Sequence, residues 1–180
     1  MTNPIDALVS LGDPRLRRAN TPVLDPTDRM FVEARETLHE ALAAFRLEHG
    51  FGRAIAAPQL NDPRRYIAMN LGNGPFTLHN PIIVWRDKET FTLWDDCMSF
   101  PDLLVRVERH SSITVQYLDE HGHECILEKV DPALSELLQH EIDHLDGVLA
   151  VDRALDKDAL VTRQAFDANP DYYHSMVDTL

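Results

Sequence analysis

Residues 139–145 read Gln139-His140-Glu141-Ile142-Asp143-His144-Leu145 and contain the pattern His-Glu-x-x-His. The stretch belongs to a helical pattern that begins near Pro132, with Asp131 as the N-cap and apolar residues at three- and four-residue spacing. Four-residue spacing puts both imidazoles on one helix face, where they can bind one metal ion beside Glu141. The pattern is typical of a metal hydrolase. A solvated helix face rich in acidic residues and histidine would show it too.

A third metal ligand has to come from another part of the chain, because a catalytic site uses three protein ligands and one open position. Cys97 is a candidate, since it follows a β-like run and precedes Pro101. A lone cysteine after a strand is more often a small buried hydrophobe. Cys125 lies inside a predicted hairpin strand without functional neighbours, so for it we keep that interpretation.

Residues 50–59 are rich in glycine and alanine and end in Gln59. Small residues let another backbone approach closely, and the Gln59 amide could donate a hydrogen bond to developing negative charge. A tight loop leaving the preceding helix would use the same residue types. Each of these three segments is ambiguous when taken alone.

The remaining periodic segments predict one long helix and several short strands. Helical spacing covers residues 27–48, and Gly50 follows as a stop signal. Apolar β-like runs occupy residues 66–69, 82–85, 90–94, 104–109, 113–118 and 124–130, with a hairpin turn at 119–122. Beyond residue 148 the chain is polar, and we expect a short helix over 156–165 and a loosely held tail. This order predicts an α+β domain of antiparallel strands packed on helices.

Composition limits the classes of partner and location. The 180 residues suit one domain, which needs no disulfide or metal merely to fold. A net charge of −13 repels phosphate backbones and anionic lipid, so we expect no nucleic-acid or membrane partner. The 2 cysteines fit a reducing compartment, and residues 1–6 lack the features of a secretory signal. We therefore expect a cytoplasmic protein.

The three segments, in this order, resemble the signature motifs of the peptide deformylase family, of which the chain would be a divergent member. The opening at residues 12–17 and Asn80-Pro81 also resemble that family, so the similarity runs from about residue 11 to 151. The resemblance implies an α+β fold with antiparallel strands around a central metal-binding helix. It implies a single domain over residues 1–180, with a core at 11–151 and a polar tail at 152–180.

The resemblance also implies roles for individual residues. It assigns one divalent metal ion, ferrous iron in the cell with zinc or nickel able to replace it, to the ligands Cys97, His140 and His144. Glu141 would be the acid/base, while Gln59 and the backbone N–H of Met98 would form the oxyanion pocket. The implied reaction is hydrolysis of an N-formylmethionyl peptide, which releases formate.

The chain departs from the family around the expected substrate. Asp95-Asp96 stands before the cysteine where the family has Glu-Gly, and a carboxylate at Asp96 adds negative charge or binds a cation. Arg53 and Ala54 replace an aliphatic residue and a glycine on the strand that in the family pairs with the substrate peptide, and Glu136 replaces an aliphatic residue or arginine. Arg53 and Glu136 match positions at or near the family's methionine pocket. If Arg53 and Glu136 face the pocket, we expect them to pair and to disfavour an apolar side chain. The alternative is that both point to solvent.

Several function classes remain open at this stage. The first is a deformylase, and the second is a related hydrolase acting on a more polar formylated or acylated peptide or small molecule. The third is a non-catalytic metal-binding relative, which Glu141 argues against because a protein that only binds metal does not need it. A cysteine hydrolase using Cys97 would keep its activity in the presence of chelators. A homo-oligomer is left open. The seven other histidines are expected at the surface, and they are His39, His49, His79, His110, His121, His123 and His174.

Overall fold

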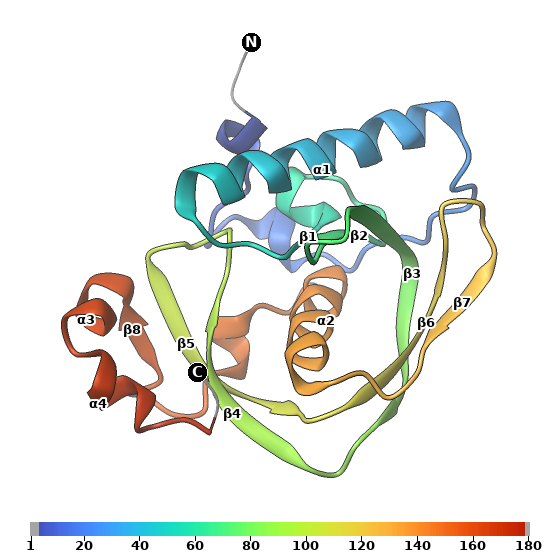
Figure 1. Ribbon diagram of the computed structural model, residues 1–180. Helices are drawn as coiled ribbons and strands as arrows, with labels where there is room; N and C mark the ends of the chain where they lie inside the picture. The colour runs from blue at the N-terminus through green and yellow to red at the C-terminus, as the bar shows by residue number, and fades with distance from the viewer. Residues whose placement is uncertain (1–3, 179–180) are drawn as a thin grey trace.

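Two antiparallel sheets enclose one helix, α2 (Pro132–Leu145), in the computed structural model of the protein (Figure 1). The structure describes residues 4–178. Residues 1–3 and 179–180 lie outside the described residues. They include the start of the stretch that we expect to lack a secretory signal and the end of the predicted C-terminal tail. The larger sheet runs in the order β1 (Ala54–Ala56), β2 (Tyr66–Asn70), β3 (Pro75–Arg86), β6 (Ile113–Leu118) and β7 (Glu124–Leu127). The smaller sheet runs in the order β4 (Thr90–Asp96), β5 (Leu103–His110) and β8 (Leu160–Thr162).

The remaining helices lie outside the space between the two sheets. They are α1 (Arg29–His49), α3 (Arg163–Ala168), α4 (Pro170–His174) and the 3-10 helices η1 (Pro4–Ala7), η2 (Pro14–Arg17), η3 (Ala57–Leu60) and η4 (Ala150–Arg153). The predicted α+β class with antiparallel strands around a central helix is confirmed. No helix within residues 4–178 is both long enough and apolar enough to cross a lipid bilayer.

Helix α2 begins where the sequence predicts and is buried along most of its length. The Asp131 side chain accepts a hydrogen bond from the backbone N–H of Leu134, which caps the first turn. Its apolar residues pack against the larger sheet in one core, and those of α2 are Leu137, Leu138, Ile142 and Leu145. The polar residues of the same helix are therefore held in fixed positions between the sheets.

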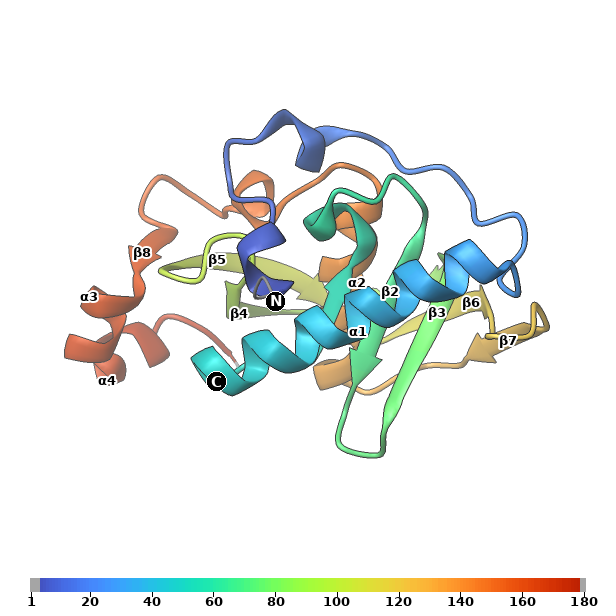
Figure 2. The same ribbon diagram turned by 90° about the horizontal axis from the view of Figure 1, so that it is seen from above.

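Helix α1 covers the opposite face of strands β1 and β2 (Figure 2). Strand β2 alternates, with Ile67 and Met69 in the core around α2, and Tyr66 and Ala68 in the core around α1. Gly50 ends α1 as predicted, with a left-handed φ of 78°. The loop that follows therefore leaves α1 directly toward β1.

The C-terminal segment differs from the prediction. A helix over 156–165 is wrong, because residues 160–162 form β8, which pairs with β5, and α3 starts only at Arg163. The segment is not loosely held either. Trp94 Nε1 donates to the carbonyl of Tyr173 at 2.8 Å, and the Asp178 carboxylate accepts from the backbone N–H of Thr92 at 2.9 Å. The polar sequence beyond residue 148 does not indicate that residues 160–162 can pair with the free edge of β5.

His79 corrects the expectation of a surface histidine. It has no exposed area, and its Nδ1 lies 3.1 Å from the carbonyl oxygens of Leu118 and Asp119. Its ring packs edge-on against Phe31 at 5.3 Å between centroids. Burial lowers the pKa of His79, so this histidine is a neutral core residue.

Candidate active site

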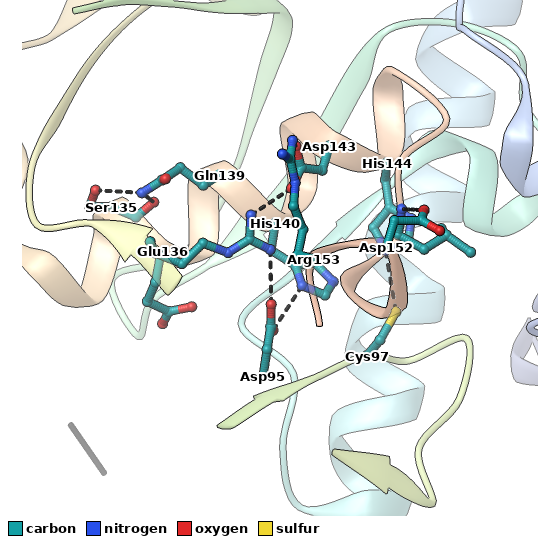
Figure 3. A network of polar contacts seen from close by, with 12 residues as sticks. Asp95, Cys97, Ser135, Glu136, Gln139, His140, Asp143, His144, Asp152 and Arg153 are labelled. Carbon is teal, nitrogen blue, oxygen red and sulfur yellow. Dashed lines mark hydrogen bonds and ion pairs between the residues drawn. The ribbon is translucent and has the colours of Figure 1, made fainter. Parts of the chain in front are cut away.

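Cys97, His140 and His144 lie together in a buried cluster, with one ligand atom of each within 4.8 Å of the others. Cys97 comes from the turn after β4, and both histidines come from α2. Cys97 Sγ lies 3.2 Å from His144 Nε2, as the dashed line in Figure 3 marks. In the described part of the chain this is the one group of such side chains with metal-ligand spacing.

Asp95 orients one of these histidines. Its Oδ1 lies 2.8 Å from His140 Nδ1 (Figure 3). Its Oδ2 accepts a hydrogen bond from Arg109 at 2.9 Å. Burial opposes the negative charge, but attraction to His140 and Arg109 outweighs it and holds the pKa of Asp95 at about 2. With Nδ1 held by a carboxylate, His140 presents Nε2 to the cluster, an arrangement typical of metal-binding histidines.

Sequence reasoning missed Asp95 and Arg109 as members of the site. A signal existed for Asp95, because it lies two residues before Cys97 at the end of a strand, where alternate residues share a face. Arg109 is 4% exposed, and it also donates to Asp143 Oδ2 at 2.5 Å. Its contact with Asp95 depends on the pairing of β4 with β5, which a local sequence pattern does not predict.

The donor set fits a divalent cation. A thiol sulfur with two imidazole nitrogens is a ligand set used by zinc and ferrous iron. Burial, together with the neighbouring His140, holds the pKa of His144 well below its ordinary value, which keeps its imidazole neutral as a ligand must be. Burial raises the pKa of the Cys97 thiol, and a cation at the cluster would stabilise the thiolate form instead.

Glu141 lies beside the cluster on α2 and is 4% exposed. Its Oε2 is buried without a hydrogen-bond partner in the protein. Burial raises the pKa of Glu141 to about 7. A carboxyl group with such a pKa can both accept and donate a proton near neutral pH.

Gln59 points its amide at the same cluster from the other side. Strand β1 ends at Ala56, and Gln59 lies on η3. Its Oε1 accepts from the Ala56 N–H at 2.9 Å, while its Nε2 lies 3.2 Å from Ser99 Oγ and 3.7 Å from Cys97 Sγ. Met98 follows Cys97 in the turn, and its side chain packs in the core around α1. The role of the Met98 N–H stays a prediction.

A cavity of about 380 Å³ opens at the cluster. The predicted site residues that line it are Arg53, Ala54, Gln59, Asp96, Cys97, Met98, Glu136, His140 and Glu141, and His144 is the exception. The structure therefore brings the three motifs of the sequence to one place.

Two ion pairs flank this cavity. Arg53 pairs with Glu136 and also donates to the carbonyl of Ala133 at 3.0 Å, so the two side chains do not both point to solvent. Glu136 is the more buried partner, at 12% exposure against 44% for Arg53. Asp96 pairs with Arg163 at 3.1 Å. The cationic partner expected for the Asp96 carboxylate is therefore the guanidinium of a residue in the same chain.

Comparison with known sequences points to one family. A family model described as polypeptide deformylase matches residues 5–159. The peptide deformylase of Thermotoga sp. (strain RQ2) is 35% identical over 153 residues, which cover 85% of this chain and 89% of the relative. The peptide deformylase of Rhizobium meliloti (strain 1021) is 33% identical over 166 residues, which cover 88% and 91%.

Solved structures with a similar fold are also peptide deformylases. The crystal structure of peptide deformylase from Thermotoga maritima has a TM-score of 0.74 at 34% identity, covering 83% of this chain and 97% of that one. The structure of a peptide deformylase from Synechococcus elongatus in complex with actinonin has a TM-score of 0.76 at 29% identity, covering 93% and 85%. Fold, motif order and sequence identity lead to the same conclusion: the chain belongs to the peptide deformylase family.

Proposed function

We propose that the protein is a peptide deformylase, a metal-dependent hydrolase that removes the formyl group from N-formylmethionyl peptides and releases formate. The observation that carries this proposal is the convergence of Cys97, His140 and His144 with Glu141 at one cavity. The names of the relatives support the substrate class. Glu141 supports catalysis rather than mere metal binding.

One divalent cation fits the site, held by Cys97 Sγ and by Nε2 of His140 and of His144. When bound, it would act as a Lewis acid and lower the pKa of water at the open position. Ferrous iron is the first choice because the resemblance to the deformylase family implies it, and one thiolate with two imidazoles suits zinc or nickel as well.

The protein's own groups carry the proton and the developing charge. Glu141 accepts a proton from the water that attacks the formyl carbon. The Gln59 amide and the Met98 N–H donate hydrogen bonds to the formyl oxygen as it gains negative charge. Glu141 then returns the proton to the nitrogen as the C–N bond breaks. The products are formate and a free amine.

The Arg53–Glu136 pair supports a second candidate, a deformylase that prefers a more polar formylated substrate. Ala54 also lines the cavity, and its methyl side chain contributes no polar atom to it. An apolar side chain packed against the ion pair would remove water from it. The hydrogen bonds to water would be lost, and the apolar side chain offers none in their place. A side chain that both donates and accepts hydrogen bonds would satisfy the pair.

We also propose a single domain over residues 1–180 and a cytoplasmic location. We expect no nucleic-acid or membrane partner, because the net charge is −13. The oligomeric state needs a separate measurement, such as sedimentation.

The test measures formate release by anaerobically purified protein of known metal content. We expect turnover of N-formyl-Met-Ala, its loss with a chelator, and its return when ferrous or zinc ion is added. Glu141→Gln should keep the metal but lose turnover by about 100-fold or more, because an amide cannot accept the proton.

Glu124→Gln, on the exposed edge strand β7, is the matched control and should change neither quantity. Full activity after metal removal would contradict the proposal and indicate a cysteine hydrolase. Normal turnover by Glu141→Gln would remove Glu141 from its role.

A further inference from the structure

A segment beyond the family match contacts residues that line the cavity. The match ends at residue 159, and β8 and α3 follow immediately. Strand β8 pairs with β5, and Thr162 caps α3 by accepting from the N–H of Ala165 at 3.2 Å. This places Arg163, the first residue of α3, beside the end of β4.

Arg163 is fixed by the backbone of the turn between β4 and β5. Its N–H donates to the carbonyl of Asp102 at 2.8 Å, and its Nε donates to the carbonyl of Pro101 at 2.8 Å. These bonds orient the guanidinium, so little side-chain freedom remains to be lost in further contacts.

The guanidinium of Arg163 joins two walls of the cavity. Its Nη2 lies 3.1 Å from Asp96 Oδ2, and its carbon lies 4.6 Å from the centroid of the Phe51 ring. Asp96 ends β4, whereas Phe51 belongs to the loop between α1 and β1, and both line the cavity. One side chain therefore bridges two segments that enter the site from different elements.

Asp96 and Phe51 lie at the open side of the cavity. The Asp96 side chain is 40% exposed and Phe51 is partly exposed, whereas Cys97 and Glu141 are buried. The formylated end of a substrate has to lie near Glu141, so the residues that follow it have to pass this opening.

We propose that Arg163 is a positioning residue that holds Phe51 and Asp96 at a fixed separation and so sets the fit of peptide residues beyond the formylated one. The inference rests on the proposed function for its substrate. It goes beyond that function because Arg163 lies outside the family match and does not line the cavity itself.

Kinetics with substrates of increasing length test the proposal, using N-formyl-Met, N-formyl-Met-Ala and N-formyl-Met-Ala-Ser. For Arg163→Met we expect KM for the longest substrate to rise about fivefold, with kcat within about twofold. KM for N-formyl-Met should stay nearly unchanged. Arg163→Lys keeps the charge and should restore part of the loss.

Arg106→Met is the matched control. Arg106 pairs with Asp156 at 2.5 Å, another ion pair near the C-terminal segment, and neither residue lines the cavity. Its loss should leave the length dependence of KM unaltered.

Hydrogen exchange gives a readout that needs no turnover. Amides of residues 50–54 should exchange faster in Arg163→Met than in Arg106→Met, because Phe51 has lost its contact with the guanidinium and keeps only those with Phe45 and His49. An equal rise of KM for all three substrates, or equal exchange in both variants, would overturn the proposal. If the unaltered protein releases no formate from any of these substrates, the proposed function fails, and exchange alone then decides the role of Arg163.

Discussion

At the scale of single residues, Asp95 links the metal ligands to the rest of the protein. Its carboxylate contacts His140 and Arg109 in a region where none of the three is more than 7% exposed. Partners of this kind typically change metal affinity 10- to 100-fold (about 1.4 to 3 kcal/mol) when they are removed.

Asp95→Asn should therefore weaken metal binding by about tenfold or more, although every ligand atom is kept. An amide carries no charge to balance Arg109 and holds the His140 ring less firmly. Metal retained after dialysis against a graded chelator measures the effect. Asp167→Asn, an exposed residue of α3, serves as the control. Equal retention by the two variants would show that Asp95 has no such role.

The pair of Arg53 and Glu136 sets a second prediction. Changing both to isoleucine should raise kcat/KM for N-formyl-Met-Ala by about tenfold relative to N-formyl-Gln-Ala, since the wall becomes apolar. Arg53→Ile alone should lower activity, because it leaves the more buried carboxylate unpaired. Burial already raises the pKa of Glu136, against the opposing effect of Arg53. No change in the ratio between the two substrates would refute a polar pocket.

Replacing Glu136 alone should lower activity less than replacing Arg53 alone. Arg53 stays 44% exposed and keeps its bond to the Ala133 carbonyl, so water can solvate it when Glu136 is gone.

At the scale of elements, the carboxylate of Asp62 stabilises the turn between η3 and β2 through hydrogen bonds. Asp62 accepts from Arg64 Nε at 2.8 Å and from the Tyr66 hydroxyl at 2.7 Å. Burial works against the charge, but these bonds outweigh it and lower the pKa of Asp62. A lowered pKa in the folded state means that the stabilisation is present above the unfolded pKa and is lost as pH falls through the folded one.

Asp62→Asn should therefore lower the free energy of unfolding by about 1 kcal/mol at pH 7. The difference from the unaltered protein should shrink as pH falls below about 4, where the unfolded carboxyl becomes protonated. Urea unfolding at pH 7, 5 and 3 measures it. A difference that stays constant with pH would show that the charge of Asp62 does not matter.

The end of α2 is fitted closely to the N-terminal segment. Asn20 N–H donates to the Leu145 carbonyl at 2.9 Å, and Gly147 follows with a φ of 75°. A Cβ at Gly147 would lie 2.6 Å from the carbonyl oxygen of Arg17. The glycine is needed both for its backbone conformation and for this close approach.

Gly147→Ala should lower the free energy of unfolding by about 3 kcal/mol, from strain and from the clash together. Gly72→Ala is a matched control, because Gly72 also has a positive φ, of 104°, but open space around it. It should cost roughly 1 to 2 kcal/mol. Equal losses in thermal or urea unfolding would mean that the contact with Arg17 adds nothing.

At the scale of the whole molecule, periodicity and capping residues predicted the two long helices and most strands. Asp131 and Gly50 mark the helix ends because capping is a local interaction. The motifs predicted which residues gather at the cavity, but they left open whether Arg53 and Glu136 pair or point to solvent, and the structure pairs them.

Features that depend on distant parts of the chain could not be predicted in this way. Strand β8 exists because the edge of β5 accepts it, and its three residues carry no periodic pattern. His79 is buried because α1 crosses over β3 with Phe31 against its ring. Arg109 and Arg163 reach the site through sheet pairing, which brings together residues that are remote in sequence.

The origin of the cluster side chains has a consequence for the order of folding. Cys97 follows β4 of the smaller sheet, whereas His140 and His144 lie on α2 between the two sheets. No local segment holds all the donor atoms, and closing such long loops is slow compared with helix formation. Metal capture during refolding should therefore lag behind the recovery of helical circular dichroism, and it would report the final closure of the two sheets around α2.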